Sequence, residues 1–182
     1  WYLSRATGVV SIVLLTAVVI LGVVTSGRRS PHGSGATIVM ALHRWLSLGM
    51  SVFLVAHILT GIFDGYVDIG LLATLVPFTS GYETLWVGIG TLAVDLLLAV
   101  IVTSLLRGRI SEPAWRLVHW FAYAMWPLAV LHGFMMGTAD EPLLRYATLA
   151  CAVVGIFAVA WRTCTTSADR AQRRLVDAQG WT

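Results

Sequence analysis

The sequence has no lysine and little charge of either sign. All 12 of its basic residues are arginine, only 12% of its 182 residues are charged and 58% are hydrophobic. A soluble domain usually has about a quarter charged residues. Runs of roughly 18 or more apolar residues recur, and each is long enough to cross ~30 Å of hydrocarbon. We therefore expect an integral membrane protein in a lipid bilayer, and the pI of about 9.2 requires no nucleic-acid partner.

Cysteine and two cofactor motifs are also scarce or absent. The only two cysteines, Cys151 and Cys164, show no paired spacing, so the sequence predicts no disulfide framework. The absence of C-x-x-C-H excludes covalent attachment of a c-type haem. The sequence also has no G-x-G-x-x-G fingerprint, which indicates that it contains no dinucleotide-binding domain of its own.

The hydrophobic runs predict an all-α bundle of five membrane spans. Their approximate bounds are 6–24, 36–63, 85–106, 113–136 and 143–161. We expect the bundle to occupy residues 1–162 and a short cytoplasmic tail to occupy 163–182. The apolar stretch Ile69–Phe78 is too short to span. It predicts either an interfacial or re-entrant cap over the outer end of the bundle or a plain amphipathic loop.

Arginine is unevenly divided between the two ends of the predicted bundle. With the N-terminus outside, the inner side collects ten arginines: Arg28, Arg29, Arg44, Arg107, Arg109, Arg116, Arg162, Arg170, Arg173 and Arg174. The outer side keeps two, Arg5 and Arg145, beside the acidic residues Asp64, Asp68, Glu83, Asp140 and Glu141. The positive-inside bias therefore predicts a multi-pass plasma-membrane protein with its N-terminus outside and its C-terminus in the cytoplasm.

Four of the five histidines lie inside two of the predicted spans. His43 and His57 are on the second span, and His119 and His132 are on the fourth. Ionisable residues at membrane depth are costly and are functional candidates. A lone membrane histidine more often bonds a neighbouring helix, but two on each of two helices indicate a site. Separations of 14 and 13 residues correspond to about 21 and 20 Å along a helix, so one metal ion cannot use both members of a pair.

Depth pairs these histidines across the two helices, which run in the same direction because the third span returns between them. His43 and His119 share the cytoplasmic level, and His57 and His132 share the outer level. Two imidazoles facing each other suit a haem iron held from both sides, which leaves no open position and indicates electron transfer. A zinc or copper site would need more ligands at one depth, and the sequence offers none. We therefore expect two b haems.

Three residues near the histidines have both a functional and an ordinary interpretation. Thirteen residues rotate a helix face by about 140°, so Pro127 is expected to kink the fourth span and re-aim one ligand, unless it is merely tolerated in packing. Trp126, midway between the two levels, fills the space between the haems or belongs to the core. Asp95, in the middle of the third span, serves a proton path or is a neutral, hydrogen-bonded carboxyl.

With its histidine pairs spaced in this way on alternate helices, the sequence resembles the ferric reductase-like membrane domain. That group includes NADPH oxidases, ferric reductases and the haem subunit serving periplasmic methionine sulfoxide reductase. The resemblance implies that the four histidines are haem ligands. Ser4-Arg5-Ala6 also resembles the oxidases, which have an arginine there near the outer haem. NADPH oxidases have an additional first span, which this sequence lacks or from which it was cut. They also have a cytoplasmic flavin and nicotinamide domain, which this sequence lacks.

The leading hypothesis is a transmembrane electron conduit, the haem subunit of an oxidoreductase without its own flavin or NAD domain. Its donor would be a cytoplasmic flavin reductase or a quinol, and its acceptor an extracytoplasmic redox partner. Arg116 at the inner level, and Arg5 and Arg145 at the outer level, are candidate partners of haem propionates or ordinary topological charges. Two alternatives stay open: a quinol-linked cytochrome b subunit, and a non-redox membrane protein whose histidines bind ions.

Overall fold

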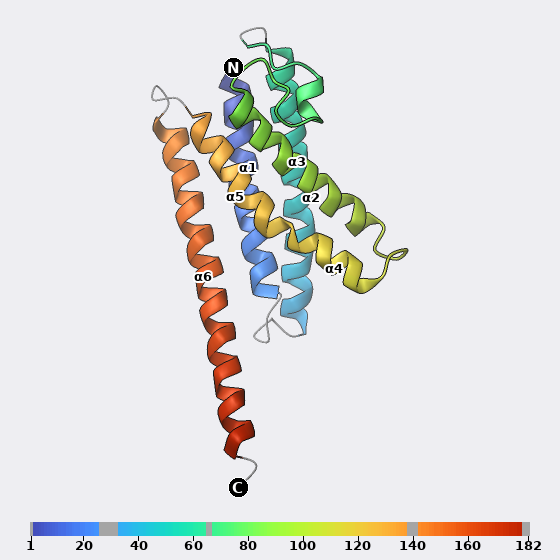
Figure 1. Ribbon diagram of the computed structural model, residues 1–182, viewed down its shortest axis with the longest axis vertical. Coiled ribbons are helices and arrows are strands. Elements are labelled where there is room, and N and C mark those ends of the chain that lie inside the picture. Colours follow the sequence, from blue (N-terminus) through green and yellow to red (C-terminus); the bar gives the residue numbers. More distant parts are fainter. Residues whose placement is uncertain (1, 26–32, 65–66, 138–141, 180–182) are drawn as a thin grey trace.

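The computed structural model describes residues 2–25, 33–64, 67–137 and 142–179, with only the backbone described for 166–179. Within these ranges its regular secondary structure is all helical (Figure 1). The elements are α1 (Tyr2–Thr25), α2 (Ser34–Phe63), the 3-10 turn η1 (Leu72–Thr74), α3 (Thr84–Leu105), α4 (Glu112–Trp120), α5 (Ala122–Met135) and α6 (Pro142–Gln179). The predicted all-α class is confirmed. Arg28, Arg29, Asp140 and Glu141, which enter the charge argument, lie outside the described residues.

Four helices are long and apolar enough to cross a membrane: α1, α2, α3 and the segment Pro142–Thr165 of α6. The span expected at 113–136 is not one continuous helix, because α4 ends at Trp120 and α5 begins at Ala122. Pro127 lies inside α5. Proline lacks an N–H and its ring crowds the carbonyl four residues earlier, which weakens the helix on its N-terminal side. Where a kink was expected, the structure has a break between two shorter helices at Phe121, six residues before Pro127.

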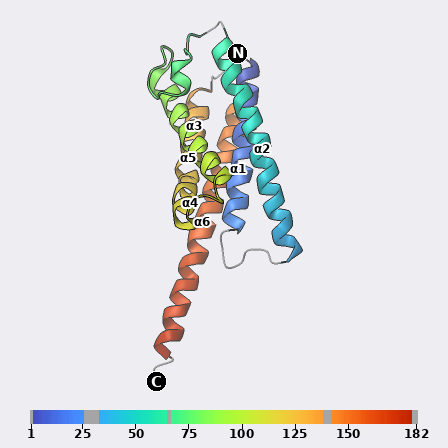
Figure 2. The ribbon, with the colours of Figure 1, turned by 90° about the vertical axis from the view of Figure 1, so that its right-hand side faces the viewer.

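Helix α6 is longer than the sequence predicted. The expected span ended at Trp161, whereas the helix continues to Gln179. Figures 1 and 2 show this C-terminal part extending well beyond the end of the other helices. The segment expected to be a short tail is thus a helical continuation of the last span.

Helix α1 is the centre of the bundle and packs against α2, α5 and α6. Its serine and threonine hydroxyls donate to carbonyls one turn earlier, as from Thr7 to Leu3 (2.7 Å) and from Ser11 to Thr7 (2.8 Å). These bonds satisfy polar groups that would be costly in a membrane interior. The core around it consists of Leu15, Val19, Val23, Met50, Ala93, Leu97, Met125 and Trp126.

The exposed surface around the helical bundle is strongly apolar. Phe63 and Leu105 are 80% and 81% exposed, and α2 has a single buried residue, Met50. Contiguous exposed apolar surface of this kind marks contact with lipid or with a partner. Figure 2 shows α2 on the opposite side of the bundle from α3, α4 and α5.

The apolar segment between α2 and α3 folds against the outer end of α3. The hydroxyl of Thr91 donates to the carbonyl of Ala73 (2.6 Å), and Ala73 is only 2% exposed. Phe78 has a left-handed backbone (φ 64°) and packs on Gly88, where a Cβ atom would lie 2.3 Å from its ring. The side chains of Leu71, Leu72 and Leu75 in the same segment are exposed. The segment therefore packs against α3 and leaves an apolar surface exposed, and the choice between a cap and an amphipathic loop stays a prediction.

Candidate functional site

The structure brings the four membrane histidines together in two pairs. The ring centres of His43 and His119 lie 6.4 Å apart with an interplanar angle of 48°. Those of His57 and His132 lie 6.2 Å apart at 75°. The pairs are the ones expected from depth, and each joins α2 to the broken helix α4–α5. The structure therefore has two separate juxtapositions of imidazoles, one at each level.

The spacing of each pair fits one metal ion between the rings. With metal–nitrogen bonds of roughly 2 Å and about 1 Å from each nitrogen to its ring centre, two opposed imidazoles have centres about 6 Å apart. Among the described elements, α2 packs extensively only on α1 and has no comparable contact with α4 or α5. The helices that carry the histidines thus face each other without packing together.

The hydrogen bonds of three histidines identify the nitrogen available to a metal. Nδ1 of His57 lies 2.7 Å from the Ser4 carbonyl, Nδ1 of His132 lies 2.8 Å from that of Trp86, and Nδ1 of His43 lies 3.2 Å from that of Val18. A carbonyl oxygen only accepts, so Nδ1 carries the proton in each bond. Nε2 then keeps its lone pair, and carbonyl-bonded histidines of this kind are typical metal ligands.

His119 is held differently. Its Nδ1 atom is buried and has no hydrogen-bond partner among the residues that the structure describes. Its ring stacks on Trp115 at 4.8 Å and 26°, and the guanidinium of Arg107 lies 3.8 Å above the Trp115 ring. Stacking therefore orients this fourth imidazole where a carbonyl orients the other three.

The donor set suits a cofactor that brings most of its own ligands. Over the described ranges, no group of three or more histidine, cysteine, aspartate or glutamate residues is placed to hold a metal ion. A structural zinc site usually needs four protein ligands, whereas haem iron receives four from the porphyrin and needs only the two axial ones. Two facing imidazoles per level fit haem.

A mainly apolar cavity lies at one of the two histidine levels. His57 and His132 line it, together with the two predicted outer arginines, Arg5 and Arg145. The Arg145 guanidinium also lies 4.5 Å from the centre of the Phe134 ring. At the inner level Arg116 forms an exposed ion pair with Glu112 on its own helix. The two outer arginines therefore share the cavity of a histidine pair, whereas Arg116 has a local partner.

Between the two levels lies the buried ring of Trp126. It is 6% exposed, and its Nε1–H donates to the Thr16 hydroxyl at 3.0 Å. The core interpretation of this residue is therefore correct, and its position between the levels is as expected. Asp95 lies outside the cavity lining, on the turn of α3 that precedes the exposed residues Leu98 and Val102.

Comparison with known proteins identifies the family. Residues 7–130 match the family described as ferric reductase like transmembrane component. The chain belongs to this family. The match includes His43, His57 and His119 and ends just before His132. The fourth histidine is therefore assigned to the site only by its position facing His57 in the structure. Neither the curated proteins nor the solved structures gave a match. Family membership and the four apolar helices together make the chain a multi-pass membrane protein with a domain suited to transmembrane redox function.

Sequence reasoning missed the partners on the neighbouring helices. Gly8 and Gly22 of α1 lie against the rings of His57 and His43 respectively. The separation of these glycines along the chain equals that of the two histidines. Because α1 and α2 are consecutive, antiparallel spans, a matched spacing of this kind is a signal that the sequence contains.

Proposed function

We propose that this protein transfers electrons across the membrane through two b haems, from a cytoplasmic flavin-type donor to an extracytoplasmic acceptor. The observation that carries the proposal is the pair of facing imidazoles at each of two levels, with ring centres 6.2 and 6.4 Å apart. His43 and His119 would hold the inner haem, and His57 and His132 the outer one. Haem held by two imidazoles supplies single-electron transfer, since no iron position is open to substrate.

The protein's own residues have three roles in this proposal. The histidines hold the two groups at fixed depths, and the carbonyls of α1 and α3 orient three of the rings. The core between the levels, including Met50, Met125 and Trp126, excludes water from the path. Helices α4 and α5 together make a fifth crossing, with the N-terminus of the chain outside.

The arginines divide between the cavity and the inner surface. We infer that Arg5 and Arg145 face the outer propionates, because both line the cavity of the outer histidines. A propionate role for Arg116 has less support, since its guanidinium already pairs with Glu112.

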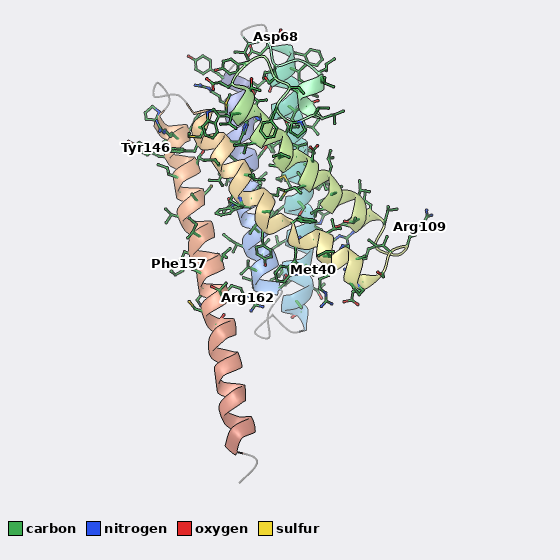
Figure 3. The ribbon with its side chains drawn as sticks, viewed as in Figure 1. Met40, Asp68, Arg109, Tyr146, Phe157 and Arg162 are labelled. Carbon is green, nitrogen blue, oxygen red and sulfur yellow. The ribbon has the colours of Figure 1, made fainter. Side chains whose placement is uncertain are left out.

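The inner end of the bundle would receive the donor. Figure 3 shows Arg109 and Arg162 near the end that also holds Met40, whereas Asp68 and Tyr146 lie toward the other end. An excess of positive charge steers an acidic protein toward the surface and accelerates association, most strongly at low salt. A flavin-bearing reductase fits this face, because flavin converts hydride transfer into single-electron steps.

The test combines haem quantification with four single variants. Purified from haem-replete cells, the protein should contain about two low-spin haems per chain, and each variant about one. His57→Ala and His132→Ala should lose the same haem, and His43→Ala and His119→Ala the other, as judged by redox titration. His32→Ala, the remaining histidine, is the matched control and should keep both.

Two results would overturn the proposal. A colourless wild-type preparation would favour the ion-binding alternative. A shared phenotype of His43→Ala and His132→Ala would contradict the pairing of levels. Reduction of the haems by a quinol, blocked by an inhibitor of quinone exchange, would replace the flavin donor with a quinol.

A further inference from the structure

Three of the four paired histidines face a glycine on the neighbouring helix. In each case the glycine lies four residues after the carbonyl that accepts the histidine's hydrogen bond. The three sets of histidine, acceptor and glycine are His57, Ser4 and Gly8; His132, Trp86 and Gly90; and His43, Val18 and Gly22. The same arrangement therefore occurs on two different helices, α1 and α3.

Helix geometry explains why the fourth residue matters. A helical carbonyl points toward the residue four positions later, whose Cβ atom tilts back toward the N-terminus of the helix. A side chain at that later position covers the carbonyl from the side. Glycine leaves the carbonyl open to a group from another helix.

The distances separate the outer histidines from the inner one. A Cβ atom at Gly8 would lie 2.9 Å from Nδ1 of His57, and one at Gly90 would lie 2.6 Å from Nδ1 of His132. Both values are shorter than any ordinary carbon–nitrogen contact. At Gly22 the nearest atom of His43 is 3.7 Å away, which is van der Waals contact. The hydrogen bonds follow the same order, at 2.7 and 2.8 Å for the outer pair and 3.2 Å for His43.

Close helix packing is the ordinary explanation for glycine in a membrane helix, because it lets two backbones approach. Here the contacts are of another kind. At Gly8 and at Gly90 the three nearest atoms are Nδ1, Cε1 and Cγ of the facing histidine. Glycine is also less favourable than alanine inside a helix. The space at these two positions is thus shaped to an imidazole ring and not to a backbone.

We propose that Gly8 and Gly90 are positioning residues for the outer haem, holding His57 and His132 in the tautomer that presents Nε2 to iron. The inference rests on the proposed function for the identity of the metal group. An imidazole whose Nδ1–H donates to a carbonyl is a more basic ligand, which stabilises ferric iron and lowers the reduction potential. Loss of either bond should therefore raise the potential of the outer haem alone.

The experiment compares Gly8→Ala and Gly90→Ala with two controls. Gly22→Ala has the same register but room for a methyl group, and Gly49→Ala meets only the Leu14 side chain at 4.0 Å. In the first two variants the outer haem should be lost, as in His57→Ala, or retained with a more positive midpoint potential. The inner haem should keep its wild-type potential. Both controls should leave both haems unchanged.

A second measurement requires neither a variant glycine nor haem. Nitrogen-15 NMR of the histidine-labelled, haem-free full chain reports which ring nitrogen of His57 and His132 is protonated, with assignment from His57→Gln and His132→Gln. We expect Nδ1. Protonation at Nε2 would overturn the inference, as would a Gly8→Ala protein whose outer haem matches that of Gly49→Ala, or equal changes in both haems. A wild-type chain that binds no haem would defeat the proposed function, while the tautomer would still decide the role of the glycines.

Discussion

The packing of Trp126 against Gly155, between the two histidine levels, can be tested by the free energy of unfolding. The Trp126 ring of α5 lies against Gly155 of α6, where a Cβ atom would be 2.1 Å from Cζ2 and 2.5 Å from Cη2 of the indole. Gly155→Ala cannot be accommodated unless the ring moves. Trp126→Phe removes the far part of that ring, together with the bond from Nε1 to the Thr16 hydroxyl.

The expected free energies follow from these contacts. Overpacking a filled core costs about 1–3 kcal/mol, which outweighs the ~0.5–1 kcal/mol that alanine gains over glycine in a helix. Trp126→Phe loses one buried hydrogen bond, worth about 0.5–1.5 kcal/mol, and some packing, for a total of about 1–3 kcal/mol. The Thr16 hydroxyl keeps its own bond to the Ile12 carbonyl (2.8 Å), so it is not left unpaired.

The double variant decides between this account and a general loss of packing. With phenylalanine at 126 the methyl group of Gly155→Ala has space, so the two costs should not add. We expect the double variant to be more stable than the sum of the two single changes by about 1 kcal/mol, within the range for contacting residues. The measurement is the free energy of unfolding in mixed micelles, with Gly49→Ala as the control for the stability that alanine gains over glycine in a helix. Additive costs, or a Gly155→Ala protein as stable as that control, would refute the reasoning.

Two further predictions concern the inner level. Pro127→Ala restores a backbone N–H within α5, so α4 and α5 should straighten toward one helix. Binding of the inner haem should then be weakened more than binding of the outer haem, as measured by the haem retained per chain and by redox titration. Equal retention of both haems would contradict this. The double variant Arg44→Gln, Arg109→Gln should slow the reduction of the haems by a flavin reductase with reduced flavin and should weaken the salt dependence of that rate. Asp68→Asn, at the other end of the bundle, should change neither. NADPH alone should leave the haems of the chain oxidised.

The histidine pairs were predictable because they depend on quantities that a sequence contains. Helix rise converts the separation of the two histidines on each helix into two depths, and an even number of crossings fixes which helices run in parallel. Neither argument needs knowledge of side-chain packing. The apolar runs likewise predict four of the helices directly, since bilayer thickness sets their length. The two predicted outer arginines line the outer cavity for the same reason of depth.

Features that depend on local packing were not predictable in the same way. Pro127 indicated a disturbance in the fourth span but not its position, since the break lies at Phe121, six residues before the proline. The length of α6 was underestimated because hydropathy marks where a span leaves the membrane and not where a helix ends. The pairing of Arg116 with Glu112 is an ordinary helix-surface contact, and it competes with a propionate for the same guanidinium.

The two histidine levels differ in how their rings are held. Along α1 and α2 the pairs Gly8 with His57 and Gly22 with His43 keep one antiparallel register. On α3, the residue as far from Gly90 as His119 is from His132 along the sequence is Thr103. Thr103 has a β-branched side chain, and its hydroxyl already donates to the Ala99 carbonyl (2.7 Å), the acceptor that the pattern would assign to His119.

Among the residues that the structure describes, Nδ1 of His119 has no hydrogen-bond partner, and its ring stacks on Trp115. The outer level has two rings fixed by carbonyls, and the inner level has one such ring and one held by an aromatic face. A carbonyl bond makes an imidazole a stronger donor to iron, so in the proposed di-haem protein the ligands alone would favour the ferric form more at the outer level. For electrons to flow outward, nearby charges must raise the reduction potential of the outer haem against this effect of the ligands. Arg5 and Arg145 in the outer cavity have the right sign, since positive charge near iron stabilises its reduced form.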